Sequence, residues 1–383
     1  MRFSLSPVTL ICMSALSTFS LADRPQPGLS ESAYGKMPDG REVKLFTLTN
    51  KSGMTAQVTE YGAILASISV PDKDGNFADV VHGYDTLEGW LVNTSYFGAT
   101  VGRFGNRLAH GRFTLDGNTC QLATNNEPGG IPCHLHGGVR GFDKVLWEGE
   151  GFEHDGERGV KLTYVSADSE EGYPGELTVE VRYALTDDDE LVWEAKATTD
   201  APTILNVVHH SYWNLSGNPA TSINDHELTL HAEDYLPTDA GLIPTGKPAP
   251  VKGTPMDFTE ATPIGERVEA DFKALALAGG YDHAWVLWKT GDDGLRKAAR
   301  LRDPETGRVM EISTNQPAIQ FYGGNFLDGS VAGKGGVVYG LRTALCLETE
   351  NYPDAPNNPD APSAVLRPGE IYHHRMLHRF SAE

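Results

Sequence analysis

Glu348 is the residue whose type and surroundings point most directly to chemistry. It follows the apolar run Ala344-Leu345-Cys346-Leu347 and precedes a turn rich in Pro and Asn, residues 351–357. The run predicts a buried strand, with Glu348 at the point where the chain leaves it. Ionised carboxylates are seldom buried without a partner, so a Glu at this edge indicates a function. The alternative is a strand-end Glu turned towards solvent.

His210 is the second candidate. It lies in the segment 209–217, directly after the strand-like residues 203–208 and beside Tyr212 and Trp213. Histidine holds or releases a proton near neutral pH. A histidine at a strand end, next to aromatic rings, is well placed to act as acid or base over a ring-shaped substrate. The alternative is a histidine that caps a turn through a hydrogen bond.

Other polar side chains occur in short loop-like segments. His136 precedes two glycines, which permit the close approach of a ligand, and Asn106 and Arg107 lie in a Gly-containing loop as donors. Asp282 could accept two adjacent hydroxyls, or it is a turn residue after Gly-Gly. Gln316 both donates and accepts. Mixed donors and acceptors among aromatic residues predict a sugar-binding site.

Other classes of chemistry lack their signatures. The pairs His134/His136, His209/His210 and His373/His374 raise the alternative of a metal site, but they lack the tight spacing to carboxylate or Cys ligands that such sites usually show. The chain has no GxSxG motif, no phosphate loop and no strand–GxGxxG–helix context. These absences disfavour a metal site, a nucleophile of the GxSxG type and a dinucleotide site.

The charge of the chain restricts its partners. The formal net charge is −21, which argues against nucleic acid, an anionic membrane surface or a phosphorylated substrate. A neutral small molecule is the ligand class that remains.

Residues 1–22 have the pattern of a secretory signal peptide. Arg2 gives a positive start, residues 8–16 are apolar, and Ser20-Leu21-Ala22 forms a small-residue cleavage site. The pattern predicts export to the periplasm or the medium, with cleavage near Ala22 and no membrane anchor. Export permits a disulfide between Cys120 and Cys133, with two free thiols as the alternative.

Strand patterns dominate the remaining chain, residues 23–383. Residues 160–165 alternate, and the stretches 177–183 and 191–197 form a clear predicted hairpin around an acidic turn. Residues 227–231 and 309–313 continue the pattern, and 264–277 is the best candidate helix. No linker or repeat divides the chain. We expect an all-β fold with few short helices, a large antiparallel β-sandwich in a single domain, and by default a monomer.

At this point the chain closely resembles the aldose 1-epimerases, or galactose mutarotases. The resemblance runs in family order over most of the predicted mature chain, through the blocks 98–113, 135–144, 171–175, 210–215, 243–246, 280–283, 320–329 and 347–357. It implies the supersandwich fold of that family and an isomerase that interconverts the anomers of free aldohexoses by acid–base ring opening, without a cofactor.

Carried over position by position, the resemblance implies that His210 is the general acid and Glu348 the general base. It implies that the substrate contacts are Asn106, Arg107, His136, Tyr212, Asp282 and Gln316. The mutual field of the acid and the base is expected to keep His210 charged and Glu348 ionised.

The chain departs from the family pattern at two positions. His209 stands where Asn is common, and Glu350 stands where Gln is usual. The unusual stretch 131–134 brings His134 close to His136, which it could support or replace. Two alternatives in function are a hexose-6-phosphate 1-epimerase, disfavoured by the negative charge, and a non-catalytic carbohydrate-binding protein of the same fold, disfavoured because both His210 and Glu348 are present.

Overall fold

The computed structural model describes residues 26–92, 95–154, 156–288, 291 and 294–383. The predicted signal peptide, residues 1–22, lies outside the described residues. No described helix has both the length and the apolar character needed to span a membrane.

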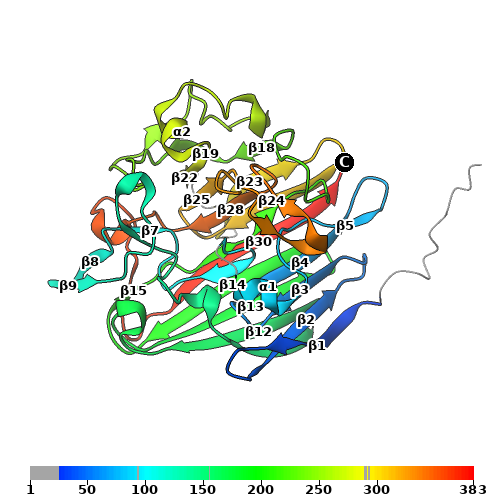
Figure 1. Cartoon of the computed structure of the whole chain (residues 1–383), viewed down its shortest axis with the longest axis horizontal. Helices are drawn as coiled ribbons and strands as arrows, with labels where there is room; N and C mark the ends of the chain where they lie inside the picture. The colour runs from blue at the N-terminus through cyan, green and yellow to red at the C-terminus, as the bar shows by residue number, and fades with distance from the viewer. Residues whose placement is uncertain (1–25, 93–94, 155, 289–290, 292–293) are drawn as a thin grey trace, which may run out of the picture.

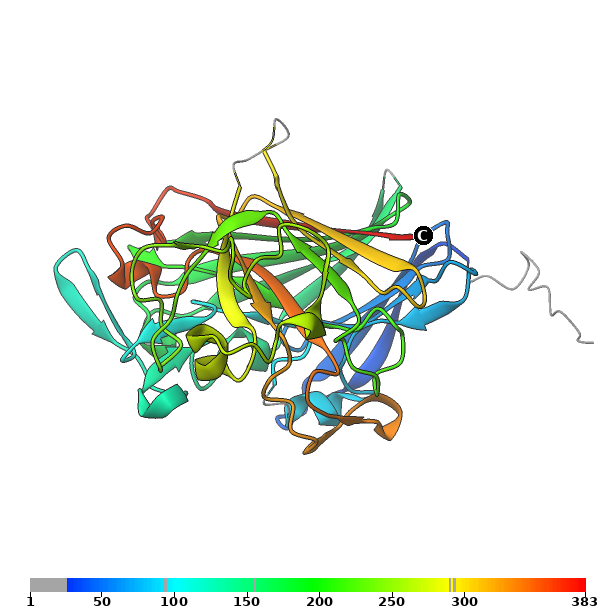
Figure 2. The same cartoon turned by 90° about the horizontal axis from the view of Figure 1, so that it is seen from above.

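A nine-stranded antiparallel sheet forms one layer (Figures 1 and 2). Its strands carry alternating buried and exposed side chains, as in the β13 pattern Leu-Thr-Val-Glu-Val, so that one face is apolar. The predicted hairpin is confirmed as β13 and β14. In spatial order the strands are β11 (Glu148–His154), β12 (Glu157–Ser166), β13 (Leu177–Thr186), β14 (Glu190–Thr199), β30 (Tyr372–Ala382), β24 (Arg308–Thr314), β23 (Arg296–Arg302), β18 (Glu227–Leu230) and β21 (Thr262–Pro263).

Two smaller antiparallel sheets pack against this layer. The first is β1 (Gly28–Lys36), β2 (Glu42–Thr49), β3 (Thr55–Thr59), β4 (Ile64–Pro71) and β5 (Phe77–Asp79). The second, in spatial order, is β17 (Tyr212–Trp213), β28 (Leu345–Glu350), β25 (Ala318–Tyr322), β22 (Asp282–Leu287), β19 (Ala232–Tyr235) and β20 (Ala249–Pro250). The expected antiparallel β-sandwich is confirmed.

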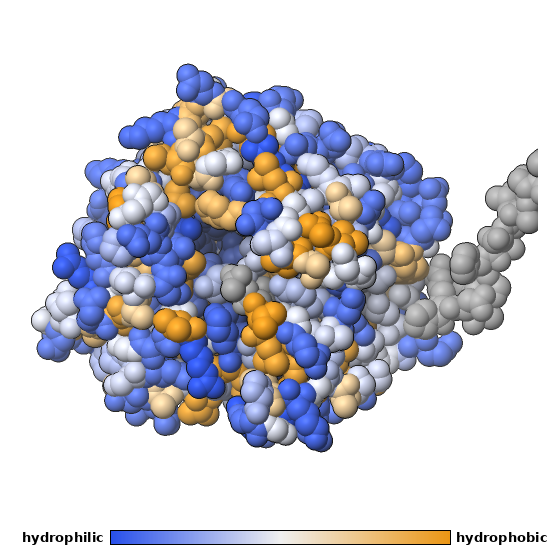
Figure 3. All heavy atoms as spheres, viewed as in Figure 1, coloured by the Kyte–Doolittle hydropathy of each residue, from blue (hydrophilic) through white to orange (hydrophobic). Residues whose placement is uncertain are grey.

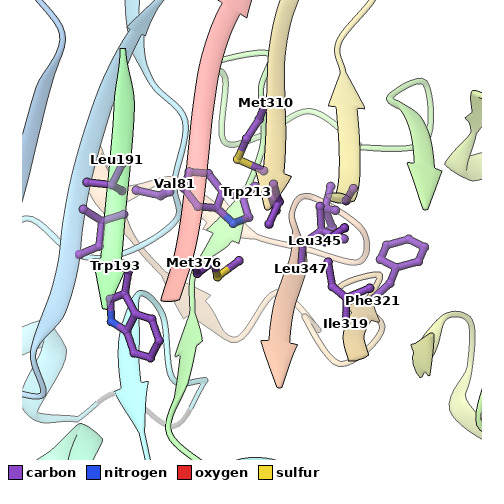
Figure 4. Close-up of a cluster of buried hydrophobic side chains, with 14 of the residues drawn as sticks. Val81, Leu191, Trp193, Trp213, Met310, Ile319, Phe321, Leu345, Leu347 and Met376 are labelled. Carbon is purple, nitrogen blue, oxygen red and sulfur yellow. The ribbon is translucent and has the colours of Figure 1, made fainter. Parts of the chain in front are cut away.

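The main core lies between the layers. Figure 4 shows Trp193 and Met376 of the nine-stranded sheet in one cluster of buried apolar side chains with Leu345 and Leu347 of β28. These side chains are fully or almost fully buried, and the same apolar cluster includes Phe46 of β2. Burial of this apolar surface fixes the register of β28, because a shift by one residue would exchange its core face for its opposite face.

The remaining strands form two-stranded pairs around the sandwich. They are β6 (Ala99–Val101) with β16 (Val208–His210), β7 (Arg107–Ala109) with β10 (Cys133–Leu135), β8 (Arg112–Leu115) with β9 (Asn118–Gln121), β15 (Thr203–Ile204) with β29 (Val365–Leu366), and β26 (Val331–Ala332) with β27 (Val338–Tyr339).

Helical structure is sparse in the described part of the chain. It consists of α1 (Leu87–Leu91), α2 (Lys273–Ala278) and isolated single turns. The helix expected over 264–277 is therefore mostly wrong. The backbone N–H groups of Ile264 and Gly265 donate to the carbonyls of His226 and Asn224, which holds that segment against the sheet. Within the expected range only a 3-10 turn at Ile264–Glu266 and the start of α2 are helical.

Several histidines are part of the core. His374 and His378 of β30 lie edge-on or tilted against Trp193 and Trp213, and His209 stacks on Trp193. Burial lowers the pKa of His374 to about 3 and that of His378 to about 4. These rings are neutral core side chains. His209 packs among them and does not line the cavity described next.

Candidate active site

A cavity of about 500 Å³ opens on the face shown in Figure 3. Its walls combine titratable, amide and aromatic side chains, which are the groups expected for a polyhydroxylated ligand. The lining includes Tyr96, Asn106, Arg107, His136, His210, Tyr212, Asp282, Gln320, Tyr322 and Glu348.

Glu348 reaches the cavity from inside β28, not from its edge. The strand continues to Glu350, so the expectation that it ends at Leu347 is wrong. Because side chains alternate along a strand, Leu345 and Leu347 face the core and Glu348 faces the cavity. The core residues thus set the direction of the carboxylate.

His210 lies directly beside Glu348, with 3.6 Å between Nε2 of the ring and Oε2 of the carboxylate. It comes from β16, where it pairs with Ala99 of β6. Tyr212 stacks on the ring at 5.3 Å between centroids, and His136 meets it edge-on at 4.8 Å. Both reactive groups are buried, so the structure brings the predicted acid and base together in a confined site.

Burial sets the protonation of this pair. It raises the pKa of Glu348 well above its ordinary value, with the negative charges of Glu350 and Asp282 acting in the same direction. It lowers the pKa of His210 to about 4. The expectation that the two groups hold each other charged is therefore wrong for the empty site, because the loss of hydration outweighs their attraction.

The substrate-binding candidates form a connected network. Arg107 Nη2 lies 3.5 Å from Asp282 Oδ2, and Gln320 Nε2 donates to Asp282 Oδ1 at 2.6 Å. The backbone N–H of Asn106 donates to Nδ1 of His136 at 3.1 Å, which leaves Nε2 as the protonated nitrogen of the neutral ring. The cavity wall includes five of the predicted contacts: Asn106, Arg107, His136, Tyr212 and Asp282.

Two predicted polar residues lie elsewhere. Gln316 is not among the described residues that line the cavity; its side-chain amide donates to Asn315 Oδ1 at 3.2 Å. His134 does not replace His136, because its ring bonds the carbonyl of Ala123 and the hydroxyl of Tyr173. Both side chains form hydrogen bonds to other protein groups.

Gln320 is the residue that sequence reasoning missed. It lies on β25 opposite Glu348 of β28, so it enters the cavity from the neighbouring strand. The period-two pattern of residues 318–322, with Ile319 and Phe321 on the core face, was the signal that places Gln320 on the opposite face.

Substitution of these two glutamines should separate their roles. Gln320→Ala removes the donor to Asp282 and is expected to lower kcat/KM about tenfold, since a lost hydrogen bond to a charged group costs roughly 1.5–3 kcal/mol. Gln316→Ala should stay within about twofold of wild type. Steady-state kinetics on both variants provides the measurement, and equal losses would contradict the assignment.

One group of described residues brings metal-ligating atoms together. Ligand atoms of His210, Cys346 and Glu348 lie within 4.8 Å of one another. We assign no metal to this group, because His210 and Glu348 already form the acid–base pair. The absence of a cofactor stays a prediction. Cys120, Cys133 and Cys346 are free thiols in the structure, so the disulfide alternative is not adopted there.

Comparisons with known proteins agree with this geometry. The family model described as Aldose 1-epimerase matches residues 44–379. The chain is 42% identical to the galactose mutarotase of Homo sapiens over 92% of this chain and 98% of that protein, and 36% identical to the aldose 1-epimerase of Escherichia coli (strain K12) over 90% and 97%. The crystal structure of galactose 1-epimerase from Lactobacillus acidophilus superposes with a TM-score of 0.81 at 27% identity, covering 93% of this chain and 99% of that one.

Proposed function

The chain belongs to the aldose 1-epimerase family of isomerases, and on that premise we propose that it interconverts the α and β anomers of free aldohexoses such as galactose and glucose, with Glu348 as the base and His210 as the acid. The observation that carries the assignment of roles is the 3.6 Å contact between the two groups at the cavity wall. Glu348 can act on one of the two oxygens bonded to the anomeric carbon, and His210 can act on the other.

The reaction needs only proton transfers. Glu348 takes the proton from the C1 hydroxyl while protonated His210 gives a proton to the ring oxygen, and the C1–O5 bond breaks to leave the open-chain aldehyde. Rotation about C1–C2 then presents the other face of the carbonyl. Ring closure returns both protons, so the enzyme is regenerated without a co-reactant.

The buried setting favours the ring-opened state. Opening converts an ionised Glu348 and a charged His210 into a neutral carboxylic acid and a neutral imidazole. Burial shifts the pKa of both groups towards these neutral forms. The site therefore disfavours the charged pair that precedes ring opening and favours the neutral pair that accompanies the aldehyde.

The charges around the cavity argue against a phosphorylated sugar. Among the described residues that line it, Arg107 is the one Lys or Arg, and it is paired with Asp282. Four carboxylates share the lining: Glu127, Asp282, Asp328 and Glu348. A phosphate dianion would lack a free cationic partner here, so a neutral sugar is favoured over a hexose 6-phosphate.

Polarimetry tests the function directly. Fresh α-D-galactose and α-D-glucose are followed with the enzyme after dialysis against EDTA, and we expect faster equilibration than in buffer alone. No acceleration, with or without added divalent cations, would overturn the proposal. Sugar binding without acceleration would identify a carbohydrate-binding protein, and activity only with added cation would overturn the cofactor-free mechanism.

We also propose that residues 1–22 direct export and that the mature chain works as a monomer. The support for export is the n-region, apolar stretch and small-residue site in the sequence, and the monomer is the default expectation. Amino-terminal sequencing of the exported protein should begin near Asp23, and light scattering should give the mass of one chain.

A further inference from the structure

Glu350 is a second carboxylate on the cavity-facing side of β28. The strand runs to this residue, and alternation puts Cys346, Glu348 and Glu350 on the same face. Glu350 is completely buried and is not among the described cavity-lining residues, so it lies behind the wall that Glu348 forms. The Cα atoms of Glu348 and Glu350 are about 7 Å apart along the strand.

Two asparagines hold Glu350 in place. Asn106 Nδ2 donates to its Oε1 at 3.0 Å, and Asn206 Nδ2 donates to its Oε2 at 3.4 Å. The orientation of both amides is fixed, because Asn106 Oδ1 accepts from the backbone N–H of Arg107 and Asn206 Oδ1 accepts from that of Asn351. Both oxygens of Glu350 therefore face N–H donors, an arrangement that suits an ionised carboxylate.

We propose that Glu350 is a positioning residue of the isomerase: an ionised, non-reacting carboxylate that strengthens Glu348 as the base and holds Asn106 at the cavity wall. The inference rests on the proposed function, since it concerns the same acid–base step.

Hydrogen bonding decides which carboxyl group of the pair takes a proton. Burial raises the pKa of Glu350 itself well above its ordinary value, while the two asparagine donors oppose that rise. Glu348 instead has Oε2 facing His210 and opens to the cavity. When two nearby carboxyl groups share one proton, the group with fewer N–H donors holds it, so Glu348 becomes the stronger base.

Other charged and titratable groups face this pair from the surrounding strands. Arg107 favours the ionised form of both carboxylates, and Asp282 disfavours it. Burial disfavours the charged forms of the remaining neighbours, so in the structure without a sugar they add no second cation: His210, Tyr212, Cys346 and Tyr372.

Glu350→Gln tests the charge separately from the hydrogen bonds. Glutamine keeps an oxygen for Asn106 and removes the negative charge. We expect both limbs of the pH profile of kcat/KM to move to lower pH, the acid limb by about one to two units. The plateau kcat should fall roughly threefold because the base is weaker, and KM should stay within about twofold.

Two further variants serve as controls. Glu311→Gln makes the same charge change at an exposed position of β24 and should leave the profile unmoved. Glu350→Ala removes both the charge and the acceptor for Asn106, so it should shift the profile and also raise KM.

The outcomes separate the inference from the function. If the wild type accelerates mutarotation and Glu350→Gln keeps the acid limb of the wild type, the inference is wrong and the function stands. If the wild type is inactive, the function itself fails. Should the Gln variant not fold, carboxyl ¹³C NMR of the wild type decides, with the Glu348 resonance assigned through Glu348→Gln: Glu350 must stay ionised at pH values where Glu348 is protonated, and the reverse order overturns the inference.

Discussion

Glu348→Gln is expected to lower kcat for mutarotation by about 10²–10⁴-fold, the usual contribution of a well-placed general base. The substitution keeps the size and hydrogen-bonding oxygen of the side chain and removes its ability to take the proton from the C1 hydroxyl. KM should change little, because the Arg107–Asp282–Gln320 network remains. Saturation kinetics by polarimetry measures both quantities.

The partner substitution sharpens this result. His210→Ala should cause a loss of similar size, and the double variant should lose little more, since the two groups act in one step. Glu311→Gln, exposed on β24, is the matched control and should retain full activity. Full activity in either active-site variant would show that the residue concerned has another role.

Acidification from pH 7 to pH 4 is expected to remove most of the stability of the fold. Burial lowers the pKa of His82 and His374 to about 3 and that of His226, His283 and His378 to about 4. Unfolded histidine titrates near 6.5, so below that pH the unfolded chain binds more protons than the native one. The contribution of these rings is complete above about pH 6.5 and is lost as pH falls towards 4.

The magnitude is large because the groups are numerous. Each unit of pKa difference corresponds to about 1.4 kcal/mol, so five rings together approach the whole 5–15 kcal/mol of a typical domain. Buried carboxyl groups with a raised pKa, such as Asp143 and Asp354, act in the opposite direction and soften the loss. The net result should be unfolding before pH 4 is reached.

Urea titrations between pH 8 and pH 4 measure this dependence. We expect the free energy of unfolding to fall steadily below pH 6.5. His378→Leu should reduce the slope by about one proton, because the Nε2 atom of His378 is buried without a partner. A flat profile for the wild type would contradict the prediction.

Local patterns were enough to predict the strands that alternate. The hairpin of β13 and β14 follows from its period of two and its acidic turn. The segments that resemble the aldose 1-epimerases predicted most of the polar residues that line the cavity. The errors have a common cause. The end of β28, the choice of Gln316 over Gln320, and the helix over 264–277 all depend on pairing with distant strands, which a single local segment does not reveal.

The charges of the acid and base were also misjudged from sequence. The pairing of Glu348 with His210 was predicted, and attraction between them was expected to dominate. The depth of burial decides the direction instead, and depth is a property of the assembled sheets.

The central place of β30 in the nine-stranded sheet affects how the chain must fold. This strand lies between β14 and β24, and its contact with β14 joins His378 to Leu191 across 187 residues of sequence. Pairings of such long range form late and slowly. Until β30 docks, β14 and β24 both present open edges that invite association with other chains. Chaperone capture of the newly made polypeptide would protect those edges until β30 docks.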